Sequence, residues 1–224
     1  MYKITVGICC YKQKNWLQRC LRSLCSQTFN KNDFEVIIVN DDPEDCLDET
    51  VEKLKNILNI KVINNTQNLG LPTSLNKILK ASLGRYFVRV DSDDYVSKDF
   101  LYMLYTCLEQ NSGTTLMGKK SYQAVACDYF KVDDVGNVLS RHKWLDEFVA
   151  CGVMFTYESL SNIGFYNEDF KMREGHELMK RFQDKYNVYN LEVPLYKYRI
   201  HDGNRTHNKK TTEIYDNKLE NINE

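Results

Sequence analysis

The sequence predicts an α/β protein with a Rossmann-like, mostly parallel sheet flanked by helices. In the first hundred residues, short apolar runs alternate with segments whose apolar residues recur at helical spacing, which is typical of strands joined by helical crossovers. Polar or acidic clusters directly follow three of these runs, where the ligand loops of such sheets lie. A length of 224 residues with 42% hydrophobic content suits one substantial core.

The first half alternates strands and helices in order. Helical periodicity places helices at 17–25, at 47–58, and between Gly70 and Gly84, with Pro72 early in the last of these. The remaining apolar runs predict strands at 4–10, 34–39, 60–63 and 85–90.

The second half has a more mixed pattern, which predicts a smaller mixed region. We expect a helix from Phe100 to Leu108, a hairpin made of 123–132 and 138–139, and a strand at 151–156. A helix at 174–186 should precede two short strands within 188–200, broken at Pro194. A single domain is expected over 1–208, followed by a polar, poorly ordered tail at 209–224.

Charge and cysteine usage exclude several classes of protein. The formal net charge is -1, and no basic run exceeds two residues, as at Lys209-Lys210, so we expect no nucleic-acid partner. The eight cysteines form no Cys-x-x-Cys pair, which argues against a metal cluster and favours a reduced, cytoplasmic setting. No run approaches the roughly 20 apolar residues of a membrane span, so membrane contact should be at most peripheral, at the inner face.

The acidic turn Asp91-Ser92-Asp93-Asp94 follows the fourth expected strand. Three carboxylates so close together repel one another, and a divalent cation would offset this repulsion. Mg²⁺ and Mn²⁺ are commonly held by one or two carboxylates together with substrate phosphates. The same residues also suit a solvated turn that caps the helix beginning near Lys98, and the turn alone does not decide between the two.

Two further clusters end the first and second strands. Asp41-Asp42 suits recognition of a nucleobase or ribose by a carboxylate, or a simple turn before Pro43. Tyr11-Lys12 lies at the corresponding end of the first strand. Because the carboxyl ends of parallel strands share one edge of a sheet, the three clusters together favour a nucleotide-diphosphate site.

An ordered series of motifs resembles family 2 glycosyltransferases of the GT-A fold. The likeness covers most of the chain to about residue 205. The matching segments are Val6 to Phe29, with Gln27-Thr28-Phe29; Phe34 to Asp42; Asn68-Leu69-Gly70-Leu71 with Asn76; Gly84-Arg85-Tyr86; Asp91 to Asp94; Ile163-Gly164-Phe165-Tyr166; and His201.

This resemblance implies roles for individual residues and an enzyme with a nucleotide-sugar donor. The halves would be 1–97 for the donor, expected to be a UDP-sugar, and 98–208 for a saccharide or lipid-linked acceptor, as in polysaccharide biosynthesis. Donor contacts would come from Cys9, Tyr11, Asp41, Asp91 and Ser92, and Mn²⁺ or Mg²⁺ would be held by Asp93, Asp94 and His201. His201 is equally compatible with an ordinary loop histidine.

The chain departs from the family pattern at the usual catalytic base. Family members commonly carry Glu-Asp at the start of the late helix, whereas this chain has Glu174-Gly175. We expect Glu174 to act as the base, with Glu177 second, since residues three apart share a helix side. Arg181 is the i+4 partner of Glu177 and gives that carboxylate a structural alternative, and His176 could also contribute.

The expected reaction is an inverting transfer of a hexosyl or hexosaminyl group. A carboxylate would deprotonate the acceptor hydroxyl, which attacks the anomeric carbon opposite the leaving diphosphate. Two alternatives stay open. A nucleotidyltransferase would need a Gly-rich, basic loop that residues 7–12 lack, and a nucleotide-sugar-binding module without transferase activity would explain Gly175.

Overall fold

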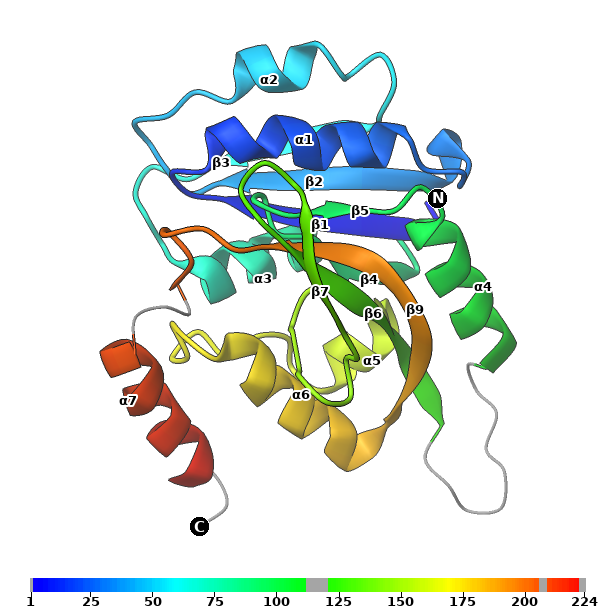
Figure 1. The fold of residues 1–224 in the computed structure, drawn as a ribbon, viewed down its shortest axis with the longest axis vertical. Coiled ribbons are helices and arrows are strands. Elements are labelled where there is room, and N and C mark those ends of the chain that lie inside the picture. Colours follow the sequence, from blue (N-terminus) through cyan, green and yellow to red (C-terminus); the bar gives the residue numbers. More distant parts are fainter. Residues whose placement is uncertain (1, 112–120, 206–208, 222–224) are drawn as a thin grey trace.

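The computed structural model describes residues 2–111, 121–205 and 209–221, and within these ranges nine strands form one sheet. Its spatial order is β3-β2-β1-β4-β8-β6-β9-β5, with β7 paired to β6 (Figure 1). The strands are β1 Ile4–Cys10, β2 Phe34–Asn40, β3 Ile60–Asn64, β4 Tyr86–Arg89, β5 Tyr95–Val96, β6 Tyr122–Val132, β7 Val138–His142, β8 Val153–Thr156 and β9 Asn187–Arg199. The helices are α1 Lys14–Cys25, α2 Asp48–Glu52, α3 Leu71–Ala81, α4 Phe100–Asn111, α5 Tyr157–Asn162, α6 Glu174–Lys185 and α7 Lys209–Glu220, with a 3₁₀ turn η1 at Lys31–Asp33.

The first four strands form the expected parallel half. β1 pairs in parallel with both β2 and β4, and β2 pairs in parallel with β3. Beyond β4 the sheet is mixed, because β8 runs antiparallel to β4 and to β6, while β6 and β9 are parallel. The predicted fold class is therefore confirmed, and the carboxyl ends of β1, β2 and β4 lie along one edge.

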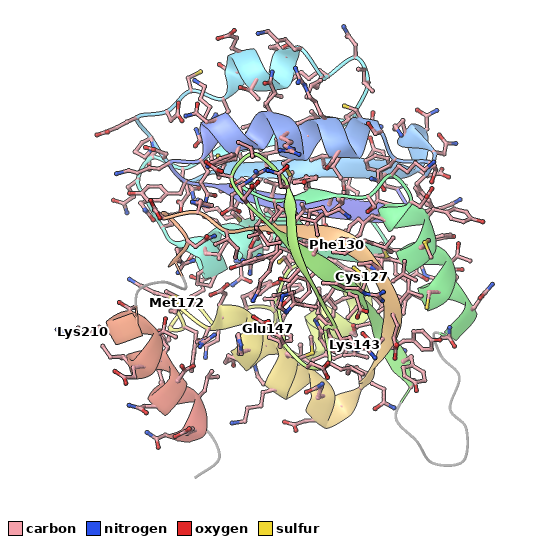
Figure 2. The ribbon with its side chains drawn as sticks, in the orientation of Figure 1. Cys127, Phe130, Lys143, Glu147, Met172 and Lys210 are labelled. Atoms are coloured by element: carbon pink, nitrogen blue, oxygen red, sulfur yellow. The ribbon has the colours of Figure 1, made fainter. Side chains whose placement is uncertain are left out.

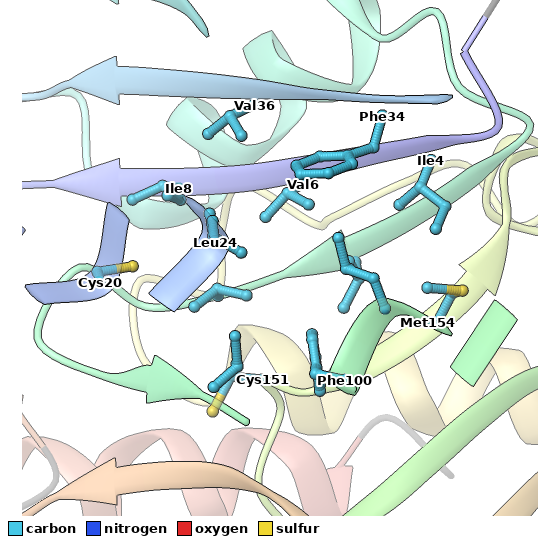
Figure 3. Packing of buried hydrophobic residues seen from close by; sticks show 14 of the residues in the cluster. Ile4, Val6, Ile8, Cys20, Leu24, Phe34, Val36, Phe100, Cys151 and Met154 are labelled. Carbon is cyan, nitrogen blue, oxygen red and sulfur yellow. The ribbon is translucent and has the colours of Figure 1, made fainter. Parts of the chain in front are cut away.

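Alternate residues of the central strands supply two hydrophobic cores, one on each face of the sheet. On β2, Val36 and Ile38 belong to the core covered by α1 and α4, whereas Ile37 and Val39 belong to the core covered by α3 and α6. Figure 3 shows Val36 beside residues of β1 in the first core, with Phe100 of α4 packed nearby. Burial on both faces explains why these strands read as continuous apolar runs.

The second helix is shorter than its periodicity suggests. α2 ends at Glu52, and the chain continues through turns in which the amide of Leu54 donates to Val51 and that of Ile57 donates to Leu54. Leu58 is nevertheless buried against the α1 side of the sheet. The apolar positions were correctly identified, but they are presented by a looser backbone.

The two strands expected within 188–200 are one strand, β9. The prediction that the strand breaks at Pro194 was wrong. The strand continues, and its register relative to β6 shifts there. Cys127 of β6 pairs with Leu191, whereas the next residue, Asp128, pairs with Pro194. The extra residues bulge out, so the proline is accommodated without ending the strand. Two short elements, β5 and α5, were not predicted.

Helix α7 spans Lys209–Glu220, which differs from the expectation of a poorly ordered tail from residue 209. The guanidinium of Arg173 donates to both carboxylate oxygens of Asp216 on α7, at 2.7 and 3.1 Å, and the Phe170 ring packs against Tyr215. In Figure 2, Met172 and Lys210 lie toward the same side of the molecule, where α7 approaches the segment before α6. Over the described residues, every helix is too short or too polar to span a bilayer.

Candidate functional site

A pocket of about 690 Å³ opens at the carboxyl edge of the parallel strands. Its floor comes from the ends of β1, β2 and β4, and its far wall comes from the start of α6 and the loop after β9. The sequence-predicted residues that line it are Cys9, Tyr11, Asp41, Asp91, Asp93, Glu174, His176 and His201. Ser92, Asp94 and Glu177 do not line it.

Asp93 and His201 meet on the wall of this pocket although they lie 108 residues apart. One carboxylate oxygen of Asp93 is 3.0 Å from His201 Nε2 and also accepts a hydrogen bond of 2.8 Å from the Gln13 side chain. Burial, together with the neighbouring Asp91, raises the pKa of Asp93, and His201 partly opposes this. A divalent cation would offset this cost, and the Asp93 carboxylate is a ligand of the kind that Mn²⁺ and Mg²⁺ prefer.

Ser92 and Asp94, which belong to the same acidic turn, face the protein interior. Asp94 is buried and accepts hydrogen bonds of 2.7 Å from the Tyr196 hydroxyl and 2.7 Å from the Arg199 amide. Ser92 donates its hydroxyl proton to the Gln13 side chain. Both residues therefore shape the turn from behind, and Asp93 is the member that faces His201.

Asp91 and Asp94 also lie close to the Cys151 thiol, with one ligand-type atom of each within 4.8 Å of the others. Burial raises the pKa of Cys151 well above its ordinary value, so the thiol keeps its proton. The thiol donates to an Asp94 carboxylate oxygen at 3.9 Å. Because Asp94 is already bonded to Tyr196 and to the Arg199 amide and does not line the pocket, Asp93 with His201 is the better cation site in the part of the chain that the structure describes.

Arg89 joins the acidic turn to helix α6. Its buried guanidinium donates to both carboxylate oxygens of Asp91, at 2.5 and 3.0 Å, and to one oxygen of Glu174 at 2.9 Å. Sequence reasoning did not identify this arginine as a site residue. The sequence nevertheless contains a sign of its role, because Arg89 is a charged residue in an otherwise apolar strand. Charged residues are almost never fully buried unless they are paired.

Asp41 organises the loop that leads into α3. Its carboxylate accepts hydrogen bonds from the amides of Leu69 and Gly70, at 2.8 and 2.9 Å, and from the side chain of Asn65 at 2.8 Å. Gly70 has a positive φ of 85°, which a glycine adopts without strain. Asp41 therefore holds the polar loop against the end of β2 while still lining the pocket.

The two glutamates of α6 have different surroundings. Glu177 is buried and forms a bidentate pair with Arg181, at 2.6 and 2.7 Å, and Arg181 also donates to the carbonyls of Ile163 and Phe165. Glu174 lines the pocket and is paired with Arg89 through one oxygen only. Among the described residues, its second oxygen has no hydrogen-bond partner.

Gly175 is required by the packing around it. A Cβ placed on this residue would lie 2.1 Å from the Ala150 Cβ, far closer than two carbon atoms approach. An aspartate here would clash with the segment before β8. Gly175 replaces the aspartate that is usual in the family, and Ala150 fills the space that the aspartate side chain would occupy.

Comparisons with known proteins agree with this architecture. Residues 5–196 match the sequence profile described as Glycosyl transferase family 2. An uncharacterized glycosyltransferase of Haemophilus influenzae is 26% identical over 91% of this chain and 67% of its own length. A poly(ribitol-phosphate) beta-glucosyltransferase of Bacillus spizizenii is 35% identical, but it matches 52% of this chain, which corresponds to 19% of that relative.

Solved structures share the fold. Staphylococcus aureus TarS 1-349 in complex with UDP-GlcNAc superposes with a TM-score of 0.74 at 22% identity, over 92% of this chain and 61% of that one. The mannosyltransferase PcManGT from Pyrobaculum calidifontis, in complex with GDP-Man and Mn²⁺, gives 0.66 at 16% identity, over 91% and 59%. The profile match covers most of the sequence, and this chain belongs to glycosyl transferase family 2.

Proposed function

We propose that this chain transfers a sugar from a nucleotide-sugar donor, expected to be a UDP-sugar, to a hydroxyl group of a saccharide or lipid-linked acceptor. The observation that carries the proposal is the convergence of Asp41, the Asp93–His201 pair and Glu174 on one pocket. Family membership and the printed ligands of the similar structures, UDP-GlcNAc and GDP-Man with Mn²⁺, support the donor class.

In this proposal the donor lies along the carboxyl edge of β1, β2 and β4. Cys9, Tyr11 and Asp41 would contact the nucleoside, and Asp91, held by Arg89, would contact the ribose or the diphosphate. Asp93 and His201 would hold Mn²⁺ or Mg²⁺. When bound, such a cation would neutralise charge on the departing diphosphate as a Lewis acid.

Glu174 is the proposed base for the acceptor hydroxyl. Arg89 fixes one of its oxygens, which leaves the other available to accept a proton at the pocket surface. Attack from the face opposite the diphosphate would invert the anomeric configuration. Glu177 is engaged by Arg181 away from the pocket, so its proposed role changes from second candidate base to a residue that fixes α6.

Sugar transfer by a Glu174→Gln variant tests the assignment of the base. The amide keeps the shape of the side chain and its contact with Arg89 but cannot accept the proton. We expect transfer from the best donor of a nucleotide-sugar panel to fall by about 10²-fold or more, with binding of that donor retained.

Two further variants complete this experiment. Glu158→Gln, on the exposed surface of α5, should transfer sugar at the wild-type rate. Glu177→Gln should mainly lower the midpoint of thermal unfolding, since it weakens a buried ion pair. Wild-type transfer by Glu174→Gln would refute the base assignment. Donor binding by the wild-type chain without transfer or donor hydrolysis would favour a binding module instead.

A further inference from the structure

Arg199, at the end of β9, is fully buried and has no carboxylate partner among the described residues. One guanidinium nitrogen, Nη2, is buried and has no hydrogen-bond partner in the described part of the chain. Burying a cation costs several kcal/mol unless opposite charges and hydrogen bonds compensate it. Ordinary core packing does not explain a buried arginine of this kind, whereas its hydrogen bonds to neighbouring turns do.

The guanidinium of Arg199 links two turns that are distant in sequence. Nε donates a hydrogen bond of 2.7 Å to the carbonyl oxygen of Asp93. Nη1 donates to the carbonyls of Asp133 and Asp134, at the tip of the β6–β7 hairpin. Arg199 therefore holds the main chain of the acidic turn from behind, by contacts that leave the Asp93 carboxylate free to face the pocket.

Arg199 also anchors the segment that carries His201. Its carbonyl accepts a hydrogen bond of 3.0 Å from the side chain of Asn204, and the oxygen of the same side chain accepts one of 2.6 Å from the His201 amide. The guanidinium lies 4.3 Å from the centre of the Trp16 ring, and that ring lies 5.6 Å from the His201 ring. Trp16 thus fills the space between the arginine and the imidazole.

We propose that Arg199 is a positioning residue that places Asp93 and His201 together before a divalent cation binds. This inference rests on the proposed metal site and adds the residue that organises it. The two ligands come from separate segments, and ordering both would otherwise reduce cation affinity. Contacts that orient metal ligands typically contribute about 10- to 100-fold to metal affinity.

The test compares Mn²⁺ binding by the full chain and by three variants. Free Mn²⁺ is measured by its electron paramagnetic resonance signal with UDP present, and thermal unfolding without metal confirms that each variant is folded. Arg199→Lys keeps the charge, and Arg199→Gln keeps a planar donor group. Arg19→Met is the matched control, because Arg19 contacts the same hairpin tip at Val135 and packs over the Tyr95 ring. Among the described residues it forms no hydrogen bond or ion pair with the acidic turn.

We expect both Arg199 variants to fold and to bind Mn²⁺ about tenfold or more weakly. Arg19→Met should bind it with wild-type affinity. Wild-type affinity in folded Arg199 variants, or equal loss in Arg19→Met, would overturn the inference. Failure of both Arg199 variants to fold beside a folded Arg19→Met would also overturn it, by assigning Arg199 a purely structural role. If the wild-type chain bound no Mn²⁺, the proposed metal site itself would be wrong.

Discussion

His176 illustrates how a single side chain in this pocket is affected by its surroundings. It follows Glu174 on the first turn of α6, and its ring packs edge-on against Phe148, with the ring centres 4.6 Å apart. Burial, and next the nearby charge of Arg173, lower the pKa of His176 to about 4. The imidazole is therefore neutral at pH 7 in the folded protein.

This neutral imidazole predicts a loss of stability in mild acid. The unfolded chain takes up a proton at His176 below about pH 6.5, whereas the folded chain takes it up only near pH 4. Stability from this residue is thus complete above pH 6.5 and falls as the pH drops toward 4, by on the order of 2 kcal/mol. Urea unfolding at pH 7.5, 5.5 and 4.5 would show this fall in the wild-type chain and a flatter dependence in His176→Gln. Identical pH dependences would contradict it.

The positions of some pocket residues could be predicted from the sequence, whereas their orientations and pairings could not. Asp41, Asp91 and Asp93 could be predicted because they lie directly after, or a few residues after, a strand whose apolar run is plain. The different orientations of Asp93 and Asp94 could not, because they depend on Tyr196 and Arg199, about a hundred residues later. The pairing of Arg89 with Glu174 spans 85 residues and was hidden for the same reason.

At the scale of elements, helix α6 combines the base candidate with a tight packing contact. Gly175 lies on its first turn against Ala150, in the segment that leads to β8. Glycine is ordinarily a poor helix residue, about 1 kcal/mol less favourable than alanine. The contact explains its presence here, since a larger residue would push the helix away from Ala150.

Gly175→Ala should therefore destabilise the protein although alanine favours helices. Overpacking of this kind typically costs about 1–3 kcal/mol, measurable by urea unfolding at pH 7.5. The double variant Gly175→Ala with Ala150→Gly removes the clash and should be more stable than the sum of the single changes predicts, with a coupling of at least about 0.5 kcal/mol. Additive effects, or a stabilised single variant, would show that the two residues do not compete for the same space.

Boundaries and pairings of elements were less predictable than their existence. The apolar positions of α2 were recognised, but its backbone loosens after Glu52 because local turns satisfy the following amides. The continuity of β9 through Pro194 depends on a register shift with β6, which a periodicity cannot show. The order of α7 depends on Arg173 and on contacts with residues 169–180, and its own sequence is polar.

For the whole molecule, the parallel half and the mixed half contribute different parts of one site. Asp41 and Asp93 belong to the part that sequence patterns describe well, whereas Glu174 and His201 come from the mixed part. Only the folded sheet brings the end of β9 beside the acidic turn, through the pairing of β5 with β9. The place of Asp41 and Asp93 at one sheet edge was therefore predictable from strand patterns. Glu174 and His201 were expected only from the family resemblance, and the contact between His201 and Asp93 could not be predicted from spacing.

Asp93 and His201 together form the proposed cation site for a nucleotide diphosphate. Titration calorimetry of UDP, with and without Mn²⁺, in wild type, Asp93→Asn and the exposed control Asp146→Ala is the decisive experiment on this site. Mn²⁺ should strengthen UDP binding in wild type and in Asp146→Ala. Asp93→Asn should lose that gain, weakening binding in Mn²⁺ at least tenfold, or about 1.4 kcal/mol. An equal gain from Mn²⁺ in Asp93→Asn and in wild type would contradict it.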